Sequence, residues 1–95
     1  MAKLGKRSLS RLEGVDPRLI TLCHAVCKDF DITVIEGFRT LETQKEYVKK
    51  GVSKTLNSKH LKGLAVDVAP YPVDWDNDSR FYFMGGLFKA YAAAL

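Results

Sequence analysis

Long apolar runs are absent from this sequence of 95 residues, so no stretch is long enough to cross a membrane. The N-terminus carries basic residues without an apolar run behind them, and it therefore has no recognisable signal peptide. There are only two cysteines, Cys23 and Cys27, and no second pair of ligands has the spacing of a zinc finger. The hydrophobic fraction of 46% excludes a disordered chain.

The two cysteines lie four residues apart in a helical pattern of apolar residues. Free cysteine behaves as a small hydrophobe, so we expect both thiols to be buried and unpaired. Unpaired thiols indicate synthesis in a reducing compartment. The chain is close to the lower size limit for folding without disulfide bonds or metal ions, and we expect one domain over residues 1–95.

Basic residues exceed acidic ones, and the net charge is +4. Several of the basic residues crowd positions 3–11, and others lie at positions 49–62. This distribution favours an anionic partner, such as a nucleic acid or an acidic cell-wall polymer. For any single lysine, a solvated surface is the better interpretation.

Periodicity, capping residues and glycines predict alternating helices and strands. The first strand is rich in β-branched residues, and the last helix has no stop signal before Leu95. We expect a short helix capped by Ser8 that ends at Leu12 before Gly14, and then a helix begun by Asp16 and Pro17 that runs to about Asp29. A strand at 32–35 and a helix at 42–50 capped by Thr40 should follow, and then a polar loop at 52–62. The remaining elements are a strand at 64–69, a turn at 73–79, and a helix capped by Asp78 or Ser79.

The stretch from Ser58 to Asp67 is a polar loop that runs into the second predicted strand. On that strand, Asp67 falls on the face opposite the branched apolar residues, and a buried carboxylate needs a partner. His60 lies upstream across Gly63, which can bend the chain back, so the imidazole and the carboxylate can form half of a zinc site. Spacing alone favours the alternative, a core aspartate that caps a neighbouring loop.

A larger set of residues resembles the zinc D,D-carboxypeptidase and endolysin peptidase family. This family includes VanY-like carboxypeptidases and the L-alanyl-D-glutamate endopeptidases of bacteriophages, and the chain most resembles the short phage and prophage endolysins. The matching residues are Glu36-Gly37-Phe38-Arg39-Thr40, Gln44, Ser58-x-His60-x-x-Gly63-x-Ala65-x-Asp67, and the flanks Ser8 to Val15, Asn57-Ser58 and Ala69-Pro70-Tyr71.

The resemblance implies a role for each matching polar residue. His60 and Asp67 are the expected zinc ligands. Arg39 is expected to face the cleft and hold a substrate carboxylate or the polarised carbonyl oxygen. Ser58 is expected to hydrogen-bond near the substrate, and Gln44 to support the loop of the arginine. The alternatives are a structural salt bridge for Arg39, a loop cap for Ser58 and a solvated helix position for Gln44.

The chain also departs from the pattern of the family. The family has a third ligand, a histidine, and a catalytic Glu or Asp a few residues before it, both after the helix that ends here at Leu95. The only other histidine, His24, matches no ligand position of the family. We therefore expect the domain to lack its C-terminal segment and to be inactive alone. The alternatives are a binding protein that has lost activity, and a second chain that supplies the missing groups.

The implied fold is α+β, with helices packed on a small, mainly antiparallel sheet and the site on its open side. The implied function is a zinc peptidase that hydrolyses the L-Ala–D-Glu bond in the peptide stem of peptidoglycan. A D-Ala-D-Ala carboxypeptidase and a non-catalytic module that binds cell wall or nucleic acid are the alternatives. For the peptidase, no nucleic-acid or membrane partner is expected. An exposed sheet edge favours dimerisation or segment exchange. The resemblance also implies that this protein, like phage endolysins of this type, waits in the cytoplasm and reaches the cell wall through a membrane pore.

Overall fold

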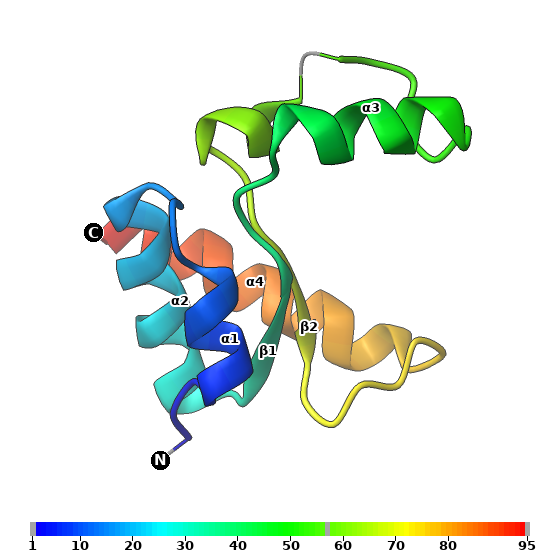
Figure 1. Ribbon diagram of the computed structural model, residues 1–95. Coiled ribbons are helices and arrows are strands. Elements are labelled where there is room, and N and C mark those ends of the chain that lie inside the picture. Colours follow the sequence, from blue (N-terminus) through cyan, green and yellow to red (C-terminus); the bar gives the residue numbers. More distant parts are fainter. Residues whose placement is uncertain (1, 57, 95) are drawn as a thin grey trace.

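The structure is a computed structural model that describes residues 2–56 and 58–94. Over these residues, helices pack around a sheet of two antiparallel strands (Figure 1), which is the predicted α+β class. The elements are α1 (Lys6–Arg11), α2 (Pro17–Asp29), β1 (Ile32–Glu36), α3 (Leu41–Lys49), the 3-10 helix η1 (Lys59–Lys62), β2 (Asp67–Pro70) and α4 (Asp78–Ala94).

Helices α1, α2 and α4 lie alongside the strands, whereas α3 lies past one end of them (Figure 1). Helix α1 packs on β1, and α4 packs on both α2 and β2. Helix α3 and η1 lie together beyond the end of the strands, at the top of Figure 1. Most of the apolar core therefore lies on the side of α1, α2 and α4. It consists of Leu4, Leu12, Val15, Cys23, Val26, Cys27, Ile32, Val34 and Met84.

The cysteines are free and buried, as predicted. Burial, with a smaller contribution from the neighbouring Cys27, raises the pKa of the Cys23 thiol to about 11. Burial likewise raises the pKa of Cys27. Both thiols thus behave as apolar core groups.

Two of the predicted helix caps are confirmed. The Oδ1 atom of Asp16 accepts a hydrogen bond from the backbone N–H of Arg18 at 2.8 Å. The Oγ1 atom of Thr40 accepts one from the N–H of Thr43 at 3.2 Å. Since these residues satisfy N–H groups that the first turn leaves free, α2 and α3 begin within one residue of the predicted positions.

The other two predicted caps are wrong. Ser8 lies inside α1, which begins two residues earlier, and its Oγ atom accepts a hydrogen bond from the backbone N–H of Val34 at 2.9 Å. Asn77, not Asp78 or Ser79, caps α4, since its side-chain oxygen accepts from Arg80 N–H at 3.3 Å. In the case of Ser8, a contact distant in sequence uses the hydroxyl that local reasoning assigned to a cap.

The second strand begins at Asp67, three residues later than predicted. Residues 59–62 form a 3-10 helix inside the predicted loop, and Gly63 follows it in a left-handed conformation. The carbonyl oxygen of Gly63 accepts a hydrogen bond from Asp16 N–H at 2.8 Å, so this segment is bonded to the start of α2 and not to β1. Leu64, predicted on the apolar face, is exposed, whereas Ala69 is fully buried.

The strand pairing contains one irregularity, a β-bulge at Ile35. The bulge leaves Ile35 without a partner and places Glu36 opposite Asp67. A regular ladder would have placed Ile35 there. The paired residues are Ile32 with Pro70, Thr33 with Ala69, Val34 with Val68 and Glu36 with Asp67.

Two of the residues used in the sequence analysis, Asn57 and Leu95, lie outside the described residues. Among those that are described, no helix combines the length and the apolar character that a membrane crossing requires.

Candidate active site

The five predicted site residues meet where the strands leave the core and reach α3. Arg39 follows β1, Gln44 lies on α3, Ser58 caps η1, His60 lies on η1, and Asp67 begins β2. Direct contacts join Arg39 to Gln44 and Ser58, and join His60 to Asp67. The backbone N–H of Arg39 also donates to the carbonyl oxygen of His60 at 3.0 Å. Residues that are far apart in the sequence therefore form one cluster.

The ring of His60 is buried and held in one orientation. Its Nδ1 atom lies 2.7 Å from the carbonyl oxygen of Gly37. A carbonyl can only accept, so Nδ1 carries the proton in the neutral imidazole, and Nε2 keeps its lone pair. The Nε2 atom lies 3.4 Å from the Oδ2 atom of Asp67. A histidine that donates one ring N–H to a backbone carbonyl and presents its other nitrogen is typical of a metal ligand.

Two glycines allow the backbone approach that places His60. A Cβ atom at Gly37 would lie 2.2 Å from the carbonyl oxygen of Arg11. A Cβ atom at Gly63 would lie 2.3 Å from the carbonyl oxygen of Gly14, and the φ angle of Gly63 is +69°, which is unfavourable for other residues. These two positions of the motif are thus explained by packing against the last residue of α1 and the segment that follows it.

The side chain of Asp67 is 59% exposed, so the prediction of a buried carboxylate is wrong. Because β2 begins at Asp67, this side chain lies at the open end of the strand pair. The interpretation as a core aspartate is excluded by the same exposure.

A third potential ligand, Glu36, was part of the motif but received no role. Its carboxylate, the His60 ring and the Asp67 carboxylate each offer a ligand atom, and these atoms lie within 4.8 Å of one another. Carboxylates that face each other across paired strands repel unless a cation or a hydrogen-bond donor compensates them. The missing signal is the bulge at Ile35, which no sequence pattern showed.

One nitrogen and carboxylate oxygens suit zinc, which accepts both ligand types. His60 and Asp67 fit this donor set, and the fixed tautomer of His60 supports it. His24, on α2, is exposed and does not belong to the cluster.

Arg39 lies almost buried beside the ligand cluster, with 10% of its side chain exposed. Its Nη1 atom donates to Gln44 Oε1 at 2.5 Å and has a longer contact of 3.5 Å with Ser58 Oγ. Its Nη2 atom donates to the carboxylate of Glu36. The ring of Tyr47 lies 4.6 Å from the guanidinium carbon. The salt bridge considered for Arg39 therefore exists, and it lies within the site.

Gln44 and Ser58 also have structural contacts. Gln44 is fully buried, so a solvated helix position is excluded. Its amide nitrogen donates to Ser53 Oγ at 2.9 Å and to the carbonyl oxygen of Thr55. Ser58 caps η1, since its Oγ accepts from His60 N–H at 3.2 Å. Both residues hold the loops that carry Arg39 and His60.

Glu36 is ionised at neutral pH. Burial alone would raise its pKa, but hydrogen bonds from Arg39 and Tyr47, with the charge of Arg39, lower the pKa below its usual value. Its Oε1 atom accepts from Arg39, and its Oε2 atom accepts from the hydroxyl of Tyr47 at 2.9 Å. Both oxygens are therefore engaged, and Glu36 is poorly suited to accept a proton as a general base.

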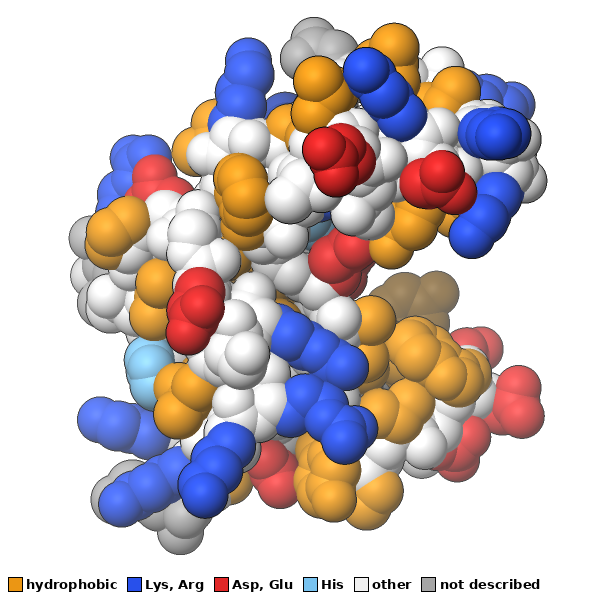
Figure 2. All heavy atoms as spheres, viewed as in Figure 1, with side chains coloured by type: hydrophobic (Ala, Val, Ile, Leu, Met, Phe, Trp, Pro, Cys, Tyr) orange, Lys and Arg blue, Asp and Glu red, His pale blue; other side chains and the backbone are white. Residues whose placement is uncertain are grey.

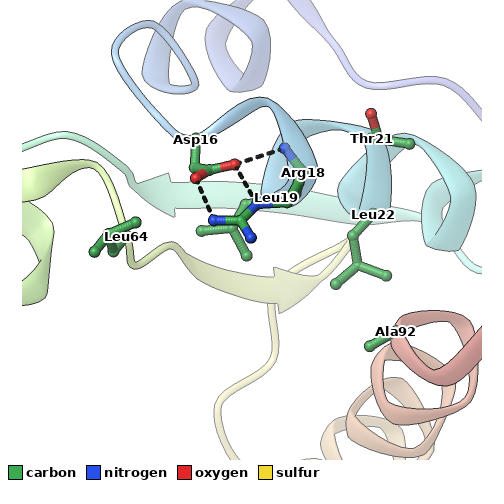
Figure 3. A pocket seen from close by; sticks show the side chains of 7 residues that line it. All are labelled: Asp16, Arg18, Leu19, Thr21, Leu22, Leu64 and Ala92. Atoms are coloured by element: carbon green, nitrogen blue, oxygen red, sulfur yellow. Dashed lines mark hydrogen bonds and ion pairs between the residues drawn. The ribbon is translucent and has the colours of Figure 1, made fainter. Parts of the chain in front are cut away.

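A separate pocket of about 570 Å³ lies between α2, α4 and the segment before β2 (Figure 3). Its walls are mostly apolar, with the ion pair of Asp16 and Arg18 among its polar groups. None of the predicted site residues lines it. Its lining residues are Asp16, Arg18, Leu19, Thr21, Leu22, Leu64 and Ala92.

Comparisons with known proteins identify the family of this chain. The profile of the family described as phage L-alanyl-D-glutamate peptidase matches residues 1–95. The L-alanyl-D-glutamate peptidase of Escherichia phage T5 is 30% identical over 95 residues, which cover 92% of this chain and 69% of that protein. The crystal structure of Serratia marcescens L-Ala D-Glu endopeptidase ChiX superposes with a TM-score of 0.79 at 33% identity, covering 90% of this chain and 67% of that one.

The family match extends over the whole chain, and the similar structure shares both fold and sequence. The resemblance seen in the motif is thereby confirmed, and the chain belongs to the phage L-alanyl-D-glutamate peptidase family.

Proposed function

We propose that this chain acts on the peptide stem of peptidoglycan as a peptidase for the L-alanyl–D-glutamate bond. The observation that carries the proposal is the His60–Asp67 pair, in which the Nε2 lone pair faces the carboxylate beside a nearly buried arginine. The choice of the L-alanyl–D-glutamate bond is based on family membership. Both similar proteins are named for the same bond, which favours it over a terminal D-Ala–D-Ala bond.

We assign His60 and Asp67 as zinc ligands. Glu36 lies close enough to join them, but its two oxygens are already bound by Arg39 and Tyr47. When bound, zinc supplies Lewis-acid chemistry that polarises a peptide carbonyl. The protein contributes the fixed imidazole, whose orientation is set by Gly37, and an exposed carboxylate that solvent and substrate can reach.

We assign Arg39 to the substrate, as the group that holds a carboxylate or the carbonyl oxygen that gains charge. A guanidinium suits either task because its N–H groups are arranged as a fork. Its contacts with Glu36, Gln44 and Tyr47 preorganise it, so little free energy is spent on ordering it when substrate binds. Ser58 lies at the edge of the same group and is assigned to substrate binding with it.

Among the described residues, the cluster offers no ligand beyond Glu36, His60 and Asp67, and because both oxygens of Glu36 are engaged, it has neither a free third ligand nor a free general base. The chain spans about two thirds of the length of each similar protein. We predict that a further segment completes the site of this single domain. Association of two chains through an exposed sheet edge also stays a prediction. The two unpaired thiols support synthesis in a reducing compartment, from which an endolysin reaches the wall through a membrane pore.

Zinc titration and muropeptide hydrolysis test the proposal. The protein should bind zinc, and His60→Ala or Asp67→Ala should weaken binding at least tenfold, whereas Asp76→Ala, an exposed acid in the loop before α4, should not. Mass spectrometry should detect cleavage between L-Ala and D-Glu by this chain or by a chain extended past Leu95. If the extended chain binds zinc but leaves the peptides intact, the peptidase assignment is wrong. Unchanged zinc affinity in both ligand variants contradicts the site assignment.

A further inference from the structure

Tyr47, on α3, contacts both members of the Arg39–Glu36 ion pair. Its hydroxyl donates to Glu36 Oε2 at 2.9 Å. Its ring lies under the guanidinium of Arg39, 4.6 Å from the guanidinium carbon. No motif of the sequence analysis included this residue. A single side chain thus bonds the carboxylate and stacks on the cation.

The contacts of Arg39 come from different directions. Gln44 and Ser58 bind one terminal nitrogen, and Glu36 binds the other. These bonds are made by the guanidinium nitrogens, whereas the guanidinium carbon lies over the ring of Tyr47. The bonds fix the nitrogens, and the ring opposes movement of the group toward its own side. Gln44 and Tyr47 are three residues apart on α3, so both project from one side of that helix.

The buried position of Arg39 also carries an unfavourable contribution to the free energy of folding. Its Nε atom is buried and has no hydrogen-bond partner among the described residues. An unpaired buried donor is unfavourable, so the other contacts must hold the arginine in place against this cost. Stacking on Tyr47 and the bond from Tyr47 to Glu36 are two of these contacts.

We propose that Tyr47 is a positioning residue for the peptidase reaction, holding Arg39 by its ring and holding Glu36, the partner of Arg39, by its hydroxyl. The inference rests on the proposed function, in which Arg39 contacts the substrate. Tyr47 itself contacts neither substrate nor metal in this proposal.

The test separates the ring from the hydroxyl. Tyr47→Phe keeps the ring and removes the bond to Glu36, and Tyr47→Leu removes both. Tyr91→Phe is the matched control, because the hydroxyl of Tyr91 also donates to a carboxylate, that of Asp29, between α4 and α2. The first readout is the side-chain Nε–Hε NMR signal of Arg39. The second is the affinity for the dipeptide L-alanyl-D-glutamate, which carries carboxylates of the proposed substrate.

The Arg39 signal should shift in Tyr47→Phe and shift further in Tyr47→Leu, while Tyr91→Phe leaves it in place. Dipeptide affinity should fall by about tenfold in Tyr47→Leu, which corresponds to about 1.4 kcal/mol, and by less in Tyr47→Phe. An unchanged Arg39 signal in Tyr47→Phe and in any folded Tyr47→Leu protein overturns the inference. If the unmodified protein neither binds the dipeptide nor cleaves muropeptides, the proposed function fails, but the Arg39 signal still decides whether Tyr47 positions the arginine.

Discussion

The orientation of His60 shows how a single residue depends on contacts far along the chain. The seven-residue spacing to Asp67 allows a metal site but does not require one. The ring is fixed by the carbonyl oxygen of Gly37, which lies 23 positions away in the sequence. That carbonyl is in place because Gly37 lets the chain directly after β1 approach the end of α1. Spacing alone therefore gave a weak signal, and the joint motif gave a strong one.

Ser8 offers a prediction at the same scale. Its hydroxyl is buried and accepts the backbone N–H of Val34, in the centre of β1. Ser8→Ala leaves that N–H without a partner and should lower the free energy of unfolding by about 1–3 kcal/mol. Ser10→Ala, at an exposed position of the same helix, should change it by less than about 0.5 kcal/mol. Urea unfolding measures both, and equal effects would contradict the role of Ser8.

At the scale of elements, local signals predicted most of the fold. The caps at Asp16 and Thr40 act within one helical turn, and both helices were placed correctly. The start of β2 and the bulge at Ile35 were missed. The strand start and the bulge both depend on which backbone atoms pair with β1. The carbonyl oxygen of Gly63 accepts a hydrogen bond from Asp16 and not from β1, so the strand starts after it. For the same reason the motif placed His60, Asp67 and Arg39 in the predicted site but assigned no role to Glu36, which lies beside them in the structure.

The turn at Gly63 provides a prediction for this element. Gly63 and Gly51 have φ angles of +69° and +76°, but only at Gly63 would a Cβ atom meet another backbone atom. Gly51→Ala should therefore lower the free energy of unfolding by about 1–2 kcal/mol, because only the left-handed conformation is unfavourable for alanine there. Gly63→Ala should cost more and should also weaken zinc binding, because the turn follows His60 directly. Urea unfolding and zinc titration provide the two measurements. Zinc affinity that falls equally in both variants would show that the turn does not place His60.

Over the whole molecule, positive charge is concentrated in two segments. Residues 1–11 contain four basic residues and no acidic one, and residues 41–62 contain six lysines and two glutamates. The rest of the chain has five basic and nine acidic residues. Figure 2 shows Lys and Arg side chains gathered over α1 and around α3. The candidate site lies where the strands reach α3, and Ser58 and His60 belong to the second basic segment, so this segment lies beside the site.

This arrangement predicts that attraction of an anionic wall depends on where the positive charge lies and not only on its total. The double variant Lys49→Glu with Lys50→Glu removes charge from the segment at α3. The double variant Lys28→Glu with Lys89→Glu changes the net charge by the same amount outside both segments, and all four lysines are exposed.

Binding to purified peptidoglycan that carries anionic polymers should weaken as salt rises, because exposed charges are screened beyond about 10 Å at 0.1 M salt. The α3 variant should bind several-fold more weakly at low salt and with a smaller salt dependence, since local charge sets the field near a surface. Sedimentation of the protein with the wall material measures this. Equal losses in the two double variants would show that net charge alone governs binding.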